Sequence, residues 1–176
     1  FSEDGAFSAK PQLCSFYDVQ QTHWTFQLKT GVQFHTGRPL TAQDVKFSIE
    51  SAMQNPSYRA QLQNIARITV TNERTVEIEL TRADGALPNK LCMPVIPSGT
   101  KSTETPPGTG RYRLTTDEEG NPQLECFEAW QGGAQMPYQT ISLVPVDKTD
   151  QLIYGFETSD IDVVTQNKFS ATQTSF

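Results

Sequence analysis

Residues 24–53, Trp24-Thr-Phe-Gln-Leu-Lys-Thr-Gly-Val-Gln-Phe-His-Thr-Gly-Arg-Pro-Leu-Thr-Ala-Gln-Asp-Val-Lys-Phe-Ser-Ile-Glu-Ser-Ala-Met53, decide the fold. Large apolar residues occupy every second position from Trp24 to Leu28, which is the pattern of a half-buried β-strand. Gly31 and Gly37 then bound a short apolar loop. The sequence therefore predicts a strand followed by a glycine-bracketed loop.

A capped helix is predicted after the loop. Thr41 precedes Asp44 by three residues, so its hydroxyl can accept a bond from the backbone N–H of residue 44, and Asp44 complements the helix dipole. Asn55-Pro56 ends the helix. One narrow apolar or small face follows from the helical spacing of Val45, Ser48, Ile49, Ala52 and Met53.

These residues also carry a family resemblance. The pattern Gly31-Val-x-Phe34-His35-x-Gly37-x-x-Leu-Thr41-Ala-x-Asp44-Val closely resembles a signature of the family 5 extracellular solute-binding proteins. These are the peptide-, dipeptide- and nickel-binding receptors of bacterial ABC importers.

Weaker matches follow along the chain. Gly108-Thr-Gly110-Arg-Tyr112 resembles the family's Gly-Thr-Gly-Pro-Tyr strand entry, with Arg111 at the usual proline position. Residues 129–132 are similar to its Tyr-Trp-x-Gly stretch, and 159–164 to its Gly-Glu-Ile-Asp-Val strand. The structural signature expected from the resemblance comprises Gly31, Phe34, His35, Gly37, Thr41, Asp44, Gly108 and Gly110.

Composition limits the class of protein. The chain has 176 residues, long enough for one domain or two small ones, and its net charge of −6 argues against a nucleic-acid partner. No run reaches the roughly 18 apolar residues of a membrane span. Because the chain begins at Phe1, we interpret it as a processed chain or an excised piece. Three distant cysteines favour free thiols over one disulfide with a spare thiol.

The rest of the chain suggests further elements. Ser57 is expected to cap a second short helix reaching Ala66, and 68–71 with 75–80 form an antiparallel hairpin. A short helix at 83–92 and an extended stretch at 93–97 follow. Beyond the loop-like tract 98–107, a hairpin is predicted from Tyr112 to Phe127. Strands at 141–146 and 159–164, with a helix at 151–156 between them, complete the prediction.

We therefore predict an α+β fold with mixed or antiparallel sheets and a few helices, part of a lobe like those of type II periplasmic binding proteins. Residues 1–97 are assigned to a smaller accessory α+β domain of the first lobe. Residues 98–176 are assigned to a mainly β segment of the first ligand-binding lobe. The resemblance implies a second lobe that is absent from this sequence.

Catalytic and metal sites find little support. His35 has no second histidine or carboxylate at ligand spacing, so a hydrogen-bonded structural imidazole is favoured. Gly108-Thr-Gly110 lacks the later residues of a phosphate loop and indicates a tight turn. No nucleophile motif occurs. We expect no metal, no cofactor and no enzymatic activity.

Aromatic residues are the candidate ligand contacts. Tyr58 follows the signature helix, where the resemblance implies an aromatic facing the cleft. Tyr112 and Trp130 are candidates on the same reasoning, because aromatic faces supply shape-tolerant contact area. Packing in the core or on the surface is the more frequent use of each of the three.

The resemblance implies a receptor that captures an oligopeptide or dipeptide outside the cell and delivers it to an ABC permease. It further implies a monomer located at the extracellular face of the membrane or in the periplasm. The full-length protein is expected to carry a lipid anchor. Nickel, haem and sugar stay open as ligands. The alternative is a secreted protein-interaction or structural module, and a small hydrolase is a third class. A single lobe should bind oligopeptides no tighter than about millimolar, because half of the burial is missing.

Overall fold

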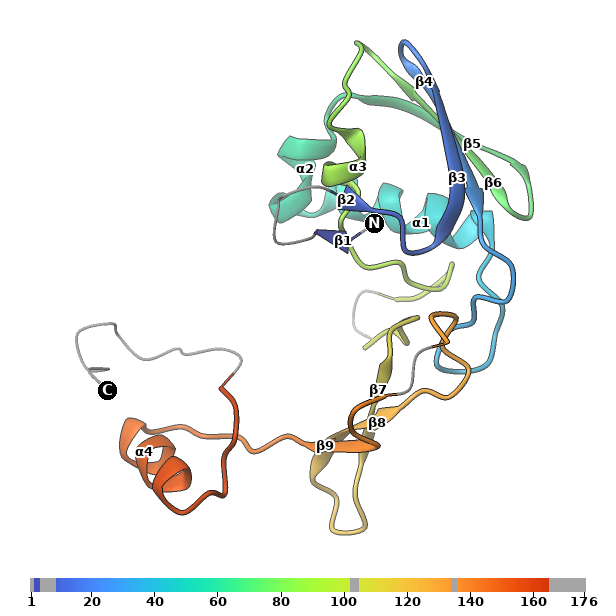
Figure 1. Ribbon diagram of the computed structural model, residues 1–176. Helices are drawn as coiled ribbons and strands as arrows, with labels where there is room; N and C mark the ends of the chain where they lie inside the picture. The colour runs from blue at the N-terminus through green and yellow to red at the C-terminus, as the bar shows by residue number, and fades with distance from the viewer. Residues whose placement is uncertain (1, 4–8, 102–104, 134–135, 165–176) are drawn as a thin grey trace. The chain divides into compact units, whose positions relative to one another are not determined.

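The computed structural model describes residues 2–3, 9–101, 105–133 and 136–164, and its contacts divide the chain into two units (Figure 1). The first unit comprises residues 1–113 and 126–137, and the second comprises 114–125 and 138–176. Residues 98–113 thus group with the first unit. The boundary predicted at residue 97 separates domains of a whole receptor lobe, and it stays a prediction. The polar tail from Thr165 lies outside the described residues.

A four-stranded antiparallel sheet forms the centre of the first unit, in the order β3 (Cys14–Gln20), β4 (His23–Leu28), β6 (Thr75–Leu80), β5 (Ile65–Asn72). Trp24 pairs with Ile78 and Phe26 with Val76, so the alternating apolar residues share one face. The predicted strand at 24–28 and the hairpin of β5 and β6 are confirmed. Edge strand β3 was not predicted.

Helices α1 (Ala42–Gln54) and α2 (Pro56–Leu62) follow the signature loop. The α1 helix packs against β5 and β6, and Ile49 and Ala52 are buried in the main core. The expectation for α2 is wrong in two respects. Asn55 caps it, because its side chain accepts from Ser57 N at 2.9 Å, and the helix ends before Ile65, which pairs within β5.

The connection from the sheet to the second half covers the core. Helix α3 (Leu87–Lys90) lies inside the predicted range 83–92, and its Leu87 is buried. Three residues of the next stretch pack on the core, namely Leu91, Met93 and Val95.

The short strands β1 (Ser2–Glu3) and β2 (Ala9–Lys10) pair antiparallel. The cysteines Cys14, Cys92 and Cys126 are free thiols.

A three-stranded sheet has the order β7-β8-β9, and the division between the two units falls within β7 (Tyr112–Thr116), after Arg113. Strand β8 (Pro122–Cys126) completes the predicted hairpin, and β9 (Thr140–Ser142) is shorter than the strand predicted at 141–146. Helix α4 (Thr149–Glu157) contains the predicted 151–156.

The predicted strand at 159–164 is wrong. Ser159 adopts a left-handed φ of +61°, which turns the chain at the end of α4. The N–H groups of Asp160 and Ile161 then both donate to Gly155 O, at 2.8 and 3.0 Å. Ile161 packs against Gly155, where an added Cβ would lie 2.7 Å from the isoleucine Cδ1. These residues therefore cap the helix instead of joining a sheet, and Asp160 and Asp162 share no strand face.

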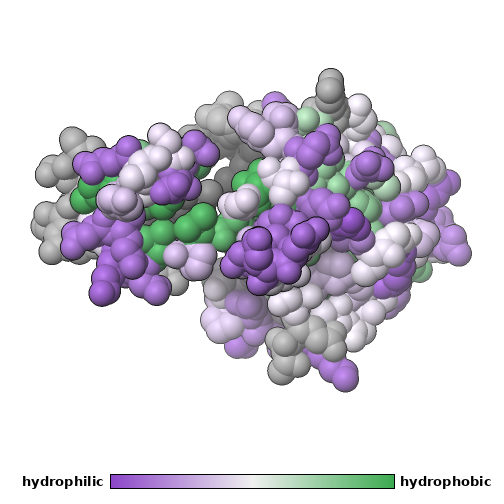
Figure 2. Space-filling model, turned by 90° about the horizontal axis from the view of Figure 1, so that it is seen from below, coloured by the Kyte–Doolittle hydropathy of each residue, from purple (hydrophilic) through white to green (hydrophobic). Residues whose placement is uncertain are grey.

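The second unit buries little of its apolar surface. Leu152 and Gly155 are its fully buried residues among those described. Among the described residues, twelve large hydrophobic side chains are exposed and nine of them belong to this unit, including Leu114, Tyr154 and Val163. One face of the molecule, shown in Figure 2, is mostly hydrophilic, with smaller hydrophobic areas exposed. We infer from its small buried area that few tertiary contacts stabilise the second unit.

Candidate functional site

The loop between β4 and α1, residues 29–41, carries most of the signature residues. Its two legs are joined by a hydrogen bond from Leu40 N to Val32 O at 2.9 Å. Gly31 and Gly37 have φ values of +75° and +82°, a left-handed conformation that favours glycine. The loop is therefore a narrow hairpin-like structure that depends on two glycines.

Asp44 lies at the base of this loop with 0% of its surface exposed. Its Oδ1 accepts hydrogen bonds from Arg38 Nη2 at 2.6 Å and from Ser98 N at 2.7 Å. Its Oδ2 accepts from Thr41 N at 2.9 Å and from the Thr41 hydroxyl at 2.8 Å. The capping box that the spacing predicts is present. Neither the burial of Asp44 nor its bonds to Arg38 and Ser98 could be predicted from the sequence pattern.

Four donors decide the electrostatics of this carboxylate. Burial alone would raise the pKa of Asp44, but hydrogen bonds from Ser98 and Thr41 outweigh it and hold the pKa below its ordinary value. Arg38 supplies the opposite charge, and its guanidinium carbon lies 5.6 Å from the centre of the buried Phe34 ring. Asp44 therefore stays ionised inside the protein.

Ser48 extends this network by one helical turn. Its hydroxyl donates to Asp44 O at 2.7 Å and accepts from Ile96 N at 2.8 Å. Together, Asp44 and Ser48 hold the backbone of residues 96–98 against α1. The network is structural, since its polar groups bond to one another.

His35 connects the two parts of the signature that are far apart in sequence. Its backbone N–H donates to Gly108 O at 2.8 Å, and its Nε2 lies 3.1 Å from Gly110 O, to which it donates when protonated. Phe127 lies edge-on to the imidazole, with ring centres 5.1 Å apart. A Cβ at Gly108 would come within 3.4 Å of His35 Cε1. The ring therefore makes the loop hydrogen bond expected of a structural imidazole.

The three candidate ligand contacts are at different places in the first unit. Tyr58 lies on α2, is half-buried and packs against the main core. Tyr112 is the half-buried first residue of β7. Trp130 belongs to the turn after Phe127, where its N–H donates to Phe127 O at 3.0 Å. Their contact with a ligand stays a prediction.

Arg111, the departure from the family pattern, contacts one of these candidates. Its guanidinium carbon lies over the Trp130 ring, 4.6 Å from the ring centre. The ring also lies against the backbone of Gly132, where a Cβ would be 1.8 Å from a ring carbon. In the sequence Arg111 stands out only as a replacement for proline, and no pattern there predicts this pair.

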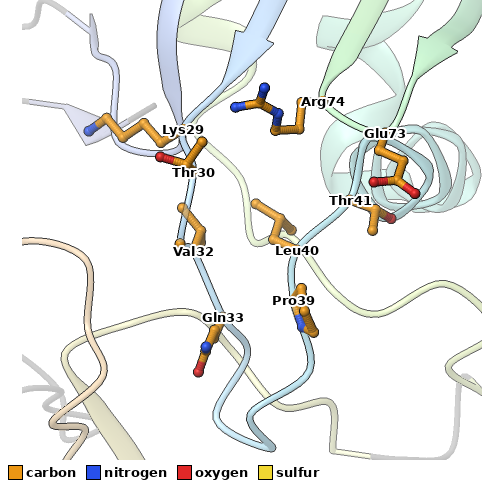
Figure 3. Close-up of a pocket in the computed structure, with 10 residues that line it drawn as sticks. Lys29, Thr30, Val32, Gln33, Pro39, Leu40, Thr41, Glu73 and Arg74 are labelled. Carbon is orange, nitrogen blue, oxygen red and sulfur yellow. The ribbon is translucent and has the colours of Figure 1, made fainter.

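A half-open cavity of about 290 Å³ lies on one side of the signature loop (Figure 3). Both legs of the loop line it, and Glu73 and Arg74 reach it from the turn between β5 and β6. The guanidinium of Arg74 extends across it toward Thr30, while Val32 and Leu40 face each other (Figure 3). Nothing in the sequence pattern had indicated this cavity.

The described residues show neither a metal centre nor a membrane span. Within residues 9–101, 105–133 and 136–164, no three His, Cys, Asp or Glu residues are grouped so that they could hold a metal ion. Over the same residues, no helix has the length and apolar character needed to cross a membrane.

Two curated relatives match part of the chain. The uncharacterized protein YhjP of Bacillus subtilis strain 168 is 30% identical over 131 residues, which are 69% of this chain and 22% of YhjP. The HTH-type transcriptional regulator SgrR of Escherichia coli strain 536 is 29% identical over 121 residues, 65% of this chain and 21% of SgrR. The chain thus matches only about a fifth of the length of each relative.

A solved structure shows the same fold over most of the chain. The periplasmic binding protein AgaA of A. tumefaciens R10, in complex with agropinic acid, superposes with a TM-score of 0.79 at 21% identity. The superposition covers 92% of this chain and 36% of AgaA. The predicted α+β lobe fold is therefore confirmed.

The family model for the bacterial extracellular solute-binding proteins, family 5, matches residues 10–175. That match includes the signature loop, the Asp44 network and the Gly108–Gly110 segment. The chain belongs to the family 5 bacterial extracellular solute-binding proteins.

Proposed function

We propose that this chain is the first-lobe part of a receptor that captures a peptide-like solute outside the cell and delivers it to an ABC permease. Family membership carries this proposal, since proteins of this family bind small solutes for ABC importers and are not enzymes. The solute would be held by burial and backbone hydrogen bonds between two lobes that close on it.

The structure supports a scaffolding role for the signature residues in this receptor. Asp44 uses both carboxylate oxygens on Arg38, Ser98 and Thr41, and His35 uses Nε2 on Gly110 O. A side chain whose donors and acceptors are already paired has little left for a solute. We therefore assign solute contact to other residues, and Tyr58, Tyr112 and Trp130 remain the candidates.

Native mass spectrometry of the full-length protein, purified without denaturation, tests this proposal. A captured solute is expected as an added mass of a few hundred daltons that dissociates on denaturation, and fragmentation would identify it as a peptide. If the protein delivers its solute to a permease, a strain lacking the gene should fail to import that solute. A full-length protein without bound solute, and without affinity for any peptide in a mixed pool, would contradict the proposal.

One observation favours a second candidate. The match to SgrR, named as a transcriptional regulator, indicates that this lobe type also occurs in a protein with a DNA-binding region. The alternative is therefore a solute-sensing or interaction module within a regulator. Sequencing the gene on both sides of this segment discriminates the two, because a helix-turn-helix region upstream favours the regulator and a secretion signal favours the receptor.

A further inference from the structure

Arg111 occupies a position where the family pattern has proline, and its side chain is exposed. Proline would remove the charge and the side chain that reaches Trp130. The 4.6 Å between the guanidinium carbon and the ring centre is within the roughly 6 Å of a cation–π contact. The substitution has therefore placed a cation over an aromatic ring.

The Trp130 ring is fixed in position under this cation. Gly132 leaves no room between its backbone and the ring, since a Cβ there would lie 1.8 Å from ring carbon Cη2. Phe127 ties the two partners together, because its N–H donates to Arg111 O at 2.8 Å and its carbonyl accepts from Trp130 N at 3.0 Å. Backbone hydrogen bonds thus hold Arg111 beside the Phe127–Trp130 turn.

The charge of Arg111 is available to a ligand. The ion pairs found among the described residues involve other cations, namely His23, Arg38, Lys46, Arg67 and Lys90. A guanidinium over a ring still presents N–H groups at its edge, in the forked geometry that a carboxylate fits. Because the Trp130 ring already holds the Arg111 side chain in place, less side-chain entropy is lost when an anion binds.

We propose that Arg111, supported by Trp130, binds a carboxylate of the solute. This inference rests on the proposed receptor function and narrows it to acidic solutes or peptides with a free C-terminus. Arg111 would then be a specificity-determining residue that a receptor with proline at this position lacks.

The test uses the full-length protein and two matched probes, a pool of tripeptides with free C-termini and the same pool with C-terminal amides. Titration calorimetry should show that the amides bind about tenfold to a hundredfold more weakly, the value of a charged hydrogen bond. In Arg111→Gln the affinity for the free acids should fall to the affinity for the amides, while the affinity for the amides should change little. Arg111→Lys should retain part of the preference, because it keeps the charge without the planar fork.

Arg67→Gln is the control, since Arg67 is an exposed cation 3.9 Å from Glu79 on the sheet, and it should leave both affinities unchanged. Equal binding of acids and amides by the wild type would overturn the inference and leave the receptor function standing. An equal loss for both pools in Arg111→Gln would also overturn it, because the role would then be structural. Binding of neither pool would overturn both.

Discussion

Replacing Asp44 by asparagine should destabilise the first unit strongly. The substitution keeps the side-chain shape but turns one carboxylate oxygen into an NH₂ group, which donates and cannot accept. Each oxygen of Asp44 now accepts two hydrogen bonds. An amide NH₂ facing Arg38 and Ser98 loses both bonds there, whereas one facing Thr41 loses the bond from Thr41 N and can donate to the Thr41 hydroxyl. In either orientation the remaining bonds also lose the negative charge that strengthens them.

The magnitude follows from these bonds. Hydrogen bonds to charged groups contribute about 1.5–3 kcal/mol each, and breaking a buried ion pair costs about 3–5 kcal/mol. Arg38 has 41% of its side chain exposed and can turn to water, which places the cost at the lower end. We expect the free energy of unfolding to fall by about 3 kcal/mol, a large part of the 5–15 kcal/mol typical of a domain.

Urea unfolding at pH 7, followed by circular dichroism, measures this loss. Hydrogen exchange should in addition show faster exchange at the Ser98 N–H, which bonds to Asp44 Oδ1. Glu50→Gln is the matched control, because Glu50 lies on the same helix, is exposed and pairs only loosely with Lys46 at 3.8 Å; it should cost less than about 0.5 kcal/mol. An Asp44→Asn variant within 0.5 kcal/mol of the wild type would refute the reasoning.

Three other predictions follow from the structure. Because the pKa of Asp44 is lower in the folded state, its contribution to stability is present above the unfolded pKa of about 3.9 and is lost as the pH falls through the folded value. Urea midpoints measured from pH 7 to pH 2 should therefore fall more for the wild type than for Asp44→Asn, and parallel curves would count against this. Gly132→Ala should displace the Trp130 ring and shift its fluorescence, whereas Gly85→Ala, with open space at its Cβ, should not; identical spectra for the two variants would show that the ring is not held there. Backbone amides of 138–164 should exchange faster than those of β4 and β6, because that part of the second unit buries only Leu152 and Gly155, and equal protection by hydrogen-exchange mass spectrometry would contradict this.

The elements that the sequence predicted well have strong local patterns. Strands β4 and β6 alternate apolar and polar residues, and α1 has both a capping pair and an apolar face. Strand β3 escaped prediction because it is an edge strand whose residues after Cys14 are all exposed, so burial imposes no alternation. The prediction of a strand at 159–164 was wrong because it followed the family resemblance. The contact of Ile161 with Gly155, which ends the helix there, was not foreseen.

The candidate site was predictable only where its contacts are local. The spacing of Thr41 and Asp44 indicated a helix cap, but Ser98 lies 54 residues away from Asp44 and carries no pattern of its own. The hydrogen bond of His35 to Gly110 spans 75 residues, so its partner could not be named from sequence. Arg111 was visible as a departure from the family pattern, and only the structure places it over Trp130.

The central claim is that this lobe captures a solute together with a second lobe. Titration calorimetry of the free-acid tripeptide pool against the full-length protein and against residues 1–176 tests it most directly. We predict micromolar binding by the full-length protein and nothing tighter than about millimolar by residues 1–176, because a single wall buries too little of the peptide. Micromolar binding by residues 1–176 alone, or no binding by the full-length protein, would contradict the account.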